Sequence, residues 1–433
     1  MTMPERFERT VTVWLRDEAE RPFPDLLDAL LERTTTTRQR QWWSSPERWL
    51  PMDTTYRANA LLRPGFSRAL LIAALVLALV GAVLVVGSRQ TRVPAPFGPA
   101  DNGHILYSAN GDIFIADADA SHPRVLVSDP ADDYAPVLSH DGTRFVFFRF
   151  TGSSDEFDVL AANVDGSDVR TLTPAPMNQP FFADWSPDGS DLLIAHGRDG
   201  VSGISILATD GSRRLRDLPT NGLSIDAPVW LPPEGREIMF RGSLVSITGL
   251  YAIGADGSGL RNIAPDRPDN SRPYSGPHIS PDGTRVTFWN DQAVDASEQH
   301  PEDHKSEVHV LDLSTGKDLR IGYDPASRHE LEPRFSPDGR SILMVRFTVD
   351  PDAASLVLAS ADGSDGAGRQ IGPPMDWQSS GSLESPSIEF SPDGHKVLLS
   401  FGADRRIQIV DVATGAVQDG DYGDFVIWQR VAR

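Results

Sequence analysis

The hydrophobic and polar positions of residues 101–433 form a repeating pattern. An apolar residue is followed by a Ser-Pro-Asp-Gly turn, or a variant of it, and then by a second apolar run. Proline fixes one turn dihedral and glycine supplies a positive φ, so each unit predicts a β-hairpin. The six units read LSHDGTRFVFF, WSPDGSDLLIA, WLPPEGREIMF, ISPDGTRVTFW, FSPDGRSILMV and FSPDGHKVLLS.

A second kind of turn alternates with the first, and each of its copies follows a short apolar strand. It reads VDGS at Asp165, TDGS at Asp210, ADGS at Asp256, STGK at Thr315, ADGS at Asp362 and ATGA at Thr414. Every repeat therefore predicts four strands. Four-stranded units of about 40 to 50 residues are typical of β-propeller blades.

The two ends of the repeat region predict how the ring closes. Residues 104–128 supply the last three strands of a further blade, and no first strand precedes them. Residues 425–430, FVIWQR, supply that strand, with Trp428 at the place that Trp185 takes in the second unit. A blade shared by both ends leaves no exposed sheet edge. The fold class is therefore all-β, a propeller of seven four-stranded blades, with six or eight blades as the alternatives.

The longest apolar run lies before the repeats. Residues 69–87, ALLIAALVLALVGAVLVVG, carry no charge and would extend about 28 Å as a helix, close to the hydrocarbon thickness of a bilayer. A buried core helix normally keeps a polar stripe, and a cleaved signal peptide does not begin with so long a polar region. We expect one transmembrane helix at 69–87, followed by a proline-rich, extended linker at 88–100.

Arginines flank the predicted span unequally, and this predicts its direction. Four arginines precede the span, at Arg48, Arg57, Arg63 and Arg68. Only two follow it closely, at Arg89 and Arg92. Because basic residues favour the cytoplasmic side, the N-terminus is expected in the cytoplasm. The sequence thus predicts a single-pass protein of the cell membrane with an extracytoplasmic propeller.

Net charge and cysteine usage exclude several classes of function. The chain carries 40 Lys and Arg against 61 Asp and Glu, a net charge of -21, which repels nucleic acid phosphates. We therefore predict no nucleic acid partner. The absence of cysteine excludes disulfides, thiolate metal sites, a cysteine nucleophile and a lipid-modified cysteine.

Residues 1–68 predict a partly helical cytoplasmic segment. Two amphipathic stretches predict short helices, and Trp42, Trp43 and Trp49 suit a membrane interface. Short helices, one span and an exported domain resemble membrane-bound anti-sigma factors, which hold a sigma subunit of RNA polymerase at the membrane. The zinc-binding His and Cys residues of many such factors are absent from this segment. The resemblance implies a sigma factor as the inner partner, and a cytoplasmic anchor without activity is the alternative.

The WSPDG and DGS turns of residues 101–433 resemble the WD-like repeats of TolB-type propeller proteins. This resemblance covers about three quarters of the chain and implies the architecture rather than an activity. Such propellers include periplasmic binding modules and protease-associated domains. The TolB propeller usually has six blades, one fewer than these repeats predict.

The sequence lacks the motifs of the common enzymes of acyl, phosphoryl and hydride transfer. It contains no GxSxG elbow, no P-loop, no HExxH and no GxGxxG after a strand. We accordingly predict no catalytic residues and no cofactor, with a propeller lyase, lactonase or glycan hydrolase as the alternative. The loop EQHPEDHKSEVH holds His300 and His304, the weak candidates for a metal site, but a solvated insertion explains this loop and we predict no metal.

Strand alternation places one residue of each first strand in the central channel. The residue before each turn serine is apolar and is expected to pack between blades, so the residue before that faces the other way. These channel positions are Val137, Asp184, Val229, His278, Arg334 and Glu389. The polar four, Asp184, His278, Arg334 and Glu389, predict either a polar binding site or a self-neutralising ion network.

Aromatic and polar residues precede the first strands and are expected to meet on one rim of the ring. They are Tyr134, Phe181, Tyr274, His329, Trp377 and Tyr422. Because Tyr and Trp are common interface anchors, this rim is the predicted binding face. The leading hypothesis is a non-enzymatic module that binds a protein or glycan partner outside the cytoplasm. The alternatives are the regulator of anti-sigma type and the propeller enzyme.

Overall fold

The computed structural model describes residues 94–152, 155–198, 201–244, 247–264, 272–293, 304–349, 352–375, 387–401 and 405–433. All the regular elements in these ranges are β-strands, and no helix among them is long and apolar enough to cross a membrane. The predicted cytoplasmic segment at 1–68, the predicted span at 69–87 and residues 88–93 of the predicted linker lie outside these ranges.

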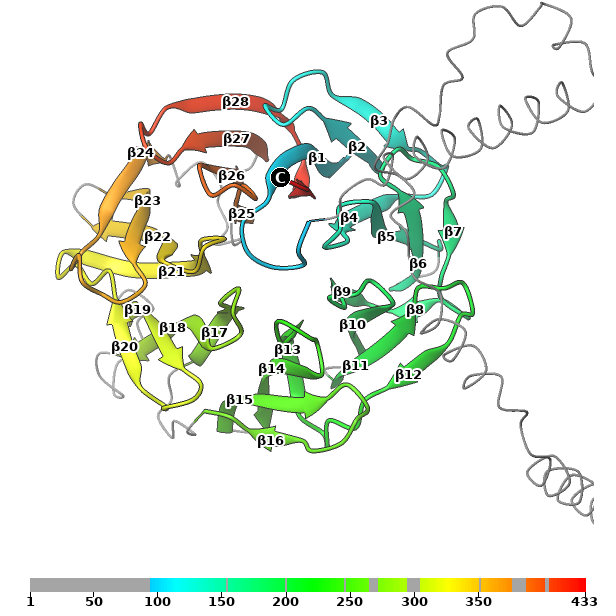
Figure 1. Cartoon of the computed structure of the whole chain (residues 1–433), viewed down its shortest axis with the longest axis horizontal. Coiled ribbons are helices and arrows are strands. Elements are labelled where there is room, and N and C mark those ends of the chain that lie inside the picture. The colour runs from blue at the N-terminus through cyan, green and yellow to red at the C-terminus, as the bar shows by residue number, and fades with distance from the viewer. Residues whose placement is uncertain are drawn as a thin grey trace, which may run out of the picture. The chain divides into compact units, whose positions relative to one another are not determined.

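The described strands form seven antiparallel blades of four strands around a central channel (Figure 1). We number the blades in chain order, beginning with the blade that contains β1. Blade 1 comprises, from the channel outward, β29 (Asp424–Val431), β1 (Asp101–Ala109), β2 (Asp112–Ala116) and β3 (Arg124–Val127). Blade 2 comprises β4 (Asp133–Leu138), β5 (Arg144–Phe150), β6 (Glu156–Asn163) and β7 (Arg170–Thr171), and β8 (Met177–Asn178) also pairs with β6.

The next three blades follow the same order from the channel outward. Blade 3 comprises β9 (Pro180–Trp185), β10 (Asp191–Arg198), β11 (Val201–Ala208) and β12 (Leu215–Asp217). Blade 4 comprises β13 (Ser224–Trp230), β14 (Glu237–Leu244), β15 (Ile247–Gly254) and β16 (Arg261–Asn262). Blade 5 comprises β17 (Arg272–Ile279), β18 (Arg285–Ala293), β19 (His304–Asp312) and β20 (Asp318–Ile321).

The last two blades complete the ring. Blade 6 comprises β21 (Ser327–Phe335), β22 (Ser341–Val349), β23 (Asp352–Ser360) and β24 (Arg369–Met375). Blade 7 comprises β25 (Ser387–Phe390), β26 (Lys396–Phe401), β27 (Arg406–Asp411) and β28 (Val417–Tyr422). One parallel bridge, between Ser306 and His329, joins blades 5 and 6.

Blade 1 closes the ring in the predicted way, with strands from both ends of the repeat region. The C-terminal strand β29 pairs with β1, and Ile105 lies opposite Trp428. Trp428 is one of the largest fully buried side chains in the described residues. The closing strand therefore contributes core packing as well as backbone pairing.

The Ser-Pro-Asp-Gly turns are held by their own side chains. In blade 2, Ser139 Oγ donates to Asp141 Oδ1 at 2.6 Å, and the same oxygen accepts the Thr143 amide at 3.0 Å. Gly142 completes the turn with φ of 66°, a conformation in which other residues are strained. The same serine-to-aspartate bond recurs at Ser186 and Asp188, Ser280 and Asp282, Ser336 and Asp338, and Ser391 and Asp393.

These turns define two faces of the ring. The face with the turns between first and second strands is called the turn face. Because neighbouring strands are antiparallel, the first strands begin on the opposite face, which is called the far face. The loops between second and third strands lie on the far face as well.

Replacing Trp428 by alanine tests the closure of the ring. A fully buried tryptophan removed from a packed core costs about 3–5 kcal/mol, so Trp428→Ala should lower the free energy of unfolding by that amount. Phe425→Ala is the matched control, because Phe425 lies in the same strand and is 53 % exposed. Urea unfolding followed by circular dichroism measures both, and equal losses would contradict the closure described here.

Candidate functional site

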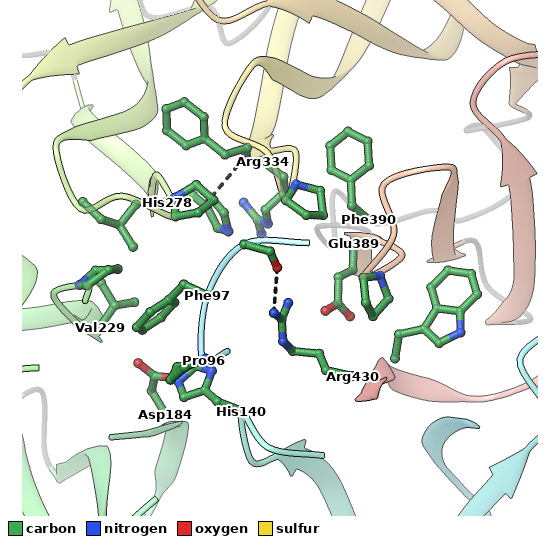
Figure 2. A pocket seen from close by; sticks show the side chains of 18 of the residues that line it. Pro96, Phe97, His140, Asp184, Val229, His278, Arg334, Glu389, Phe390 and Arg430 are labelled. Carbon is green, nitrogen blue, oxygen red and sulfur yellow. Dashed lines mark hydrogen bonds between the residues drawn. The ribbon is translucent and has the colours of Figure 1, made fainter. Parts of the chain in front are cut away.

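The channel holds a cavity of about 340 Å³ that is lined by the innermost strands of all seven blades. The six predicted channel positions all line it, and Ile427 supplies the equivalent position of blade 1 (Figure 2). The lining residues on which the argument depends are Val137, Asp184, Val229, His278, Arg334, Glu389, Ile427, His140 and Arg430. The sequence pattern thus located the channel positions of six blades, and Ile427 of blade 1 was not among them.

Apart from the bridge between Ser306 and His329, each innermost strand pairs on one side only, so its other edge faces the channel. In blade 4, β13 pairs with β14 and leaves the Trp230 amide on this free edge. The carboxylate of Asp184, from blade 3, accepts that amide at 3.1 Å. The Trp230 indole returns a hydrogen bond of 3.3 Å to the Asp184 carbonyl. Asp184 therefore joins two blades, and part of its hydrogen-bonding capacity is used by the fold.

A similar contact is made at one further junction between blades. His278 Nδ1 of blade 5 accepts the Phe335 amide of blade 6 at 3.2 Å (Figure 2). At the junction of blades 7 and 1, the Trp428 amide acts to lower the pKa of Glu389, against the larger effect of burial. Two of the four predicted polar residues, Asp184 and His278, thus cap the free edge of the next blade. Sequence reasoning missed this role, because it depends on how neighbouring blades face each other.

Arg334 has a different set of partners. Its guanidinium pairs with Glu332 of the same strand at 3.0 Å and donates to the Pro333 carbonyl at 3.0 Å. Among the described residues, no ion pair shorter than 4.0 Å joins Asp184, His278, Arg334 and Glu389 to one another. These four side chains share one cavity without forming a closed network of ion pairs.

Burial shifts the pKa values of the channel groups toward their neutral forms. It raises the pKa of Asp184 and that of Glu389 to about 7. Burial, reinforced by the nearby charge of Arg334, lowers the pKa of His278 to about 3. His278 is therefore neutral at physiological pH, and since its Nδ1 is an acceptor, its Nε2 carries a hydrogen that can be donated into the channel.

A segment that the sequence placed in the linker enters the channel. Residues 94–100, here called the strap, lie at its turn-face mouth, where Pro96, Phe97 and Gly98 line the cavity (Figure 2). Arg430 donates to the carbonyls of Ala95 at 3.1 Å and Gly98 at 2.6 Å. The Ala100 amide donates to the Pro392 carbonyl at 2.9 Å. The proline-rich composition predicted an extended form, but the strap bends at residues 96–98, where Gly98 has φ of 84°, and the composition gave no signal of these contacts.

The predicted rim residues come from the far face, but their side chains differ in exposure. Phe181 and Tyr422 are 50 % and 48 % exposed. Tyr274 is buried against Phe288, so the prediction that it offers a contact surface is wrong. Its ring packs inside blade 5 rather than on the rim.

Three further rim predictions have separate outcomes. Tyr134 packs against Phe157 with ring centroids 5.2 Å apart, and burial raises the pKa of its hydroxyl. His329 Nδ1 lies 3.0 Å from Ser306 Oγ, and Trp377 is outside the described residues. Sequence reasoning missed Phe425, which is 53 % exposed, touches Tyr134 and has φ of 52°, a rare backbone conformation for so bulky a residue.

The weak metal candidates are not placed by the structure. His300 lies outside the described residues, and of His304 only the backbone, at the start of β19, is described. In the described ranges, no cluster of three or more His, Asp or Glu side chains has the geometry to hold a metal ion.

Solved structures with the same architecture are numerous, although no family model matches the chain. Oligogalacturonate lyase from Vibrio parahaemolyticus is 11% identical with a TM-score of 0.52, and the match covers 75% of this chain and 95% of that one. Hydrazine synthase from Kuenenia stuttgartiensis is 14% identical with a TM-score of 0.52, and covers 75% and 97%. The fold is a β-propeller.

TolB from Acinetobacter baumannii is also similar to this propeller, at 15% identity and a TM-score of 0.46 over 77% of this chain and 81% of that one. Similarity at these identities shows the architecture alone. The fold therefore does not decide whether this chain is an enzyme.

Substitutions of Asp184 test the edge-capping contact. Asp184→Ala leaves the buried Trp230 amide without its acceptor, which should lower the free energy of unfolding by about 1–3 kcal/mol. Asp184→Asn is the matched control, since its amide oxygen can still accept and the loss should be smaller. Urea unfolding of both variants gives the comparison, and equal losses would argue against the contact.

The raised pKa of Glu389 predicts a pH-dependent stability. The unfolded carboxyl releases its proton near 4.5, whereas the folded one holds it to about 7, so the folded state binds more protons in between. Its contribution is fully present below pH 4.5 and is lost as the pH rises through 7. Glu389→Gln should remove this dependence.

The measurement is the difference in urea midpoint between the wild type and Glu389→Gln across this range. We expect the variant to gain stability relative to the wild type as the pH rises. A difference that stays constant with pH would mean that Glu389 titrates at its ordinary pKa in the folded protein.

Proposed function

We propose that this protein is a binding module anchored in the cell membrane through residues 69–87, with its propeller outside the cytoplasm. Its partner is a protein or a glycan, and the contact surface comprises the channel and the exposed aromatic residues of the far face. The observation that carries the proposal is the polar cavity at the centre of the ring, where the seven innermost strands meet.

The chemistry of the cavity favours binding over proton transfer. Asp184 and His278 each accept a backbone amide of the next blade, and Arg334 is paired with Glu332. Groups held in this way are fixed in position and change protonation at a cost to the fold. They suit recognition, since His278 Nε2 and the remaining carboxylate oxygens keep hydrogen-bonding capacity for a ligand.

The far face supports a macromolecular partner. Phe181, Tyr422 and Phe425 are each about half exposed there, and Phe425 adopts a backbone conformation that carries strain. Aromatic residues held rigidly in solvent are common anchors of protein interfaces. Backbone strain persists where the surrounding structure enforces it, and it is frequent at binding sites.

A second candidate, a transmembrane regulator acting through residues 1–68, is favoured by the strap. The strap follows the predicted span in the chain and contacts the channel through Arg430. Ligand binding in the channel would therefore act on a segment that follows the predicted span closely in the chain. A sigma factor is the inner partner that this candidate proposes.

Photocrosslinking in native membranes tests the binding function. A photoreactive residue at Phe181 should form an adduct of defined mass, because a partner on the far face would cover it. Val169 is the matched control, since it is 42 % exposed and lies at the turn face, between the third and fourth strands of blade 2. Adducts at both positions alike, or at neither, would contradict a binding surface on the far face.

A further inference from the structure

The strap occupies the mouth of the channel as a ligand would. Arg430 holds two of its carbonyls, Ala100 is tied to the Pro392 carbonyl, and Phe97 lies 4.8 Å from the His140 ring. Phe97 also lines the cavity that contains Asp184 and Val229 (Figure 2). One aromatic side chain and a few hydrogen bonds therefore fill space that a ligand entering from the turn face would need.

The contacts that hold the strap are few enough to be reversible. Ala95 and Pro99 are exposed, and Pro94, Pro96 and Pro99 favour an extended backbone even when the strap is free. Little conformational entropy is therefore lost on docking or gained on release. Arg430 Nε is buried and has no hydrogen-bond partner, so the guanidinium retains a donor that the strap does not use.

The described side chains around Arg430 favour a peptide backbone as its ligand in the docked state. Glu389 is the carboxylate whose charge acts on Arg430, yet no ion pair within 4.0 Å joins the two. The guanidinium instead donates two hydrogen bonds to carbonyls of the strap. The mouth thus binds main-chain carbonyls of a segment that bends at residues 96–98.

We propose that the strap is a reversible plug of the channel, which docks at the turn-face mouth and is released when a ligand takes its place. This proposal rests on the proposed function, because it assumes that the channel binds a ligand. Docked strap and bound ligand exclude each other, so ligand binding would release residues 94–100 from the mouth. In this way the propeller would report an occupied channel to the membrane-proximal part of the chain.

A peptide with the strap sequence, PAPFGPA, tests whether the mouth is a peptide site. The full-length chain carries Pro94→Ser, Pro96→Ser and Phe97→Ser, which keep the length of the strap but remove its aromatic ring and two of its three prolines. We expect a fluorescent PAPFGPA peptide to bind this variant at least about tenfold more tightly than the wild type, whose own strap competes at high effective concentration. Adding Arg430→Gln should abolish binding, whereas adding Arg406→Gln should not, because Arg406 lies at an exposed edge of blade 7.

Equal binding to the wild type and the strap variant, or no binding to either, would overturn the proposal. A second measurement covers a strap variant that fails to fold. The chain has no native cysteine, so the thiol of Phe97→Cys can be compared with that of Ser212→Cys, an exposed position. We expect at least about tenfold slower modification at position 97, and equal rates would overturn docking of the strap.

Different experiments test the plug proposal and the proposed binding function. The peptide and thiol measurements need no natural partner, whereas the crosslink at Phe181 does not depend on the strap. A crosslink at Phe181, together with equal peptide binding to the wild type and the strap variant, would support the binding function and contradict the plug. Tighter peptide binding to the strap variant, without a crosslink at Phe181, would support the plug. It would also mean that no partner contacts the far face at that position.

Discussion

A ring of separate sheets must satisfy the inner edges of its blades, and most of the channel depends on how this is done. Apart from the bridge between Ser306 and His329, each first strand pairs only with the second strand, which leaves amides and carbonyls facing the centre. Asp184 and His278 each cap one of these amides on the following blade. An uncapped buried amide would cost about 1–3 kcal/mol, so these polar side chains are part of the fold before they are part of any site.

Edge capping also sets the chemistry left for binding. Burial and the charge of Arg334 keep His278 neutral, and the capping contact at Nδ1 leaves Nε2 as its donor. Burial raises the pKa values of Asp184 and Glu389 to about 7, although neighbouring backbone amides act to lower them. The channel therefore changes charge close to neutral pH. Arg430 belongs to the same cavity, yet its contacts are with the strap rather than with another blade. The centre of the ring thus combines rigid groups from the blades with one segment that can leave.

The sequence predicted the architecture because its turns are local. Asp141 and Gly142 form their hairpin from neighbouring residues alone, and alternation along a strand then places Asp184 or Val229 in the channel without knowledge of the rest. Contacts between blades were not predictable in this way. The pairing of Asp184 with the Trp230 amide, the burial of Tyr274 and the docking of Phe97 depend on the angle and distance between units that are far apart in the chain.

Residue-resolved hydrogen exchange tests the capping of the inner edges most directly. The Trp230 and Ile279 amides occupy the same place in blades 4 and 5, but the preceding blade offers Asp184 to the first and Val229 to the second. Capping predicts that the Trp230 amide exchanges at least about tenfold more slowly than the Ile279 amide. Equal rates, or slower exchange at Ile279, would contradict the claim that channel side chains close the edges of neighbouring blades.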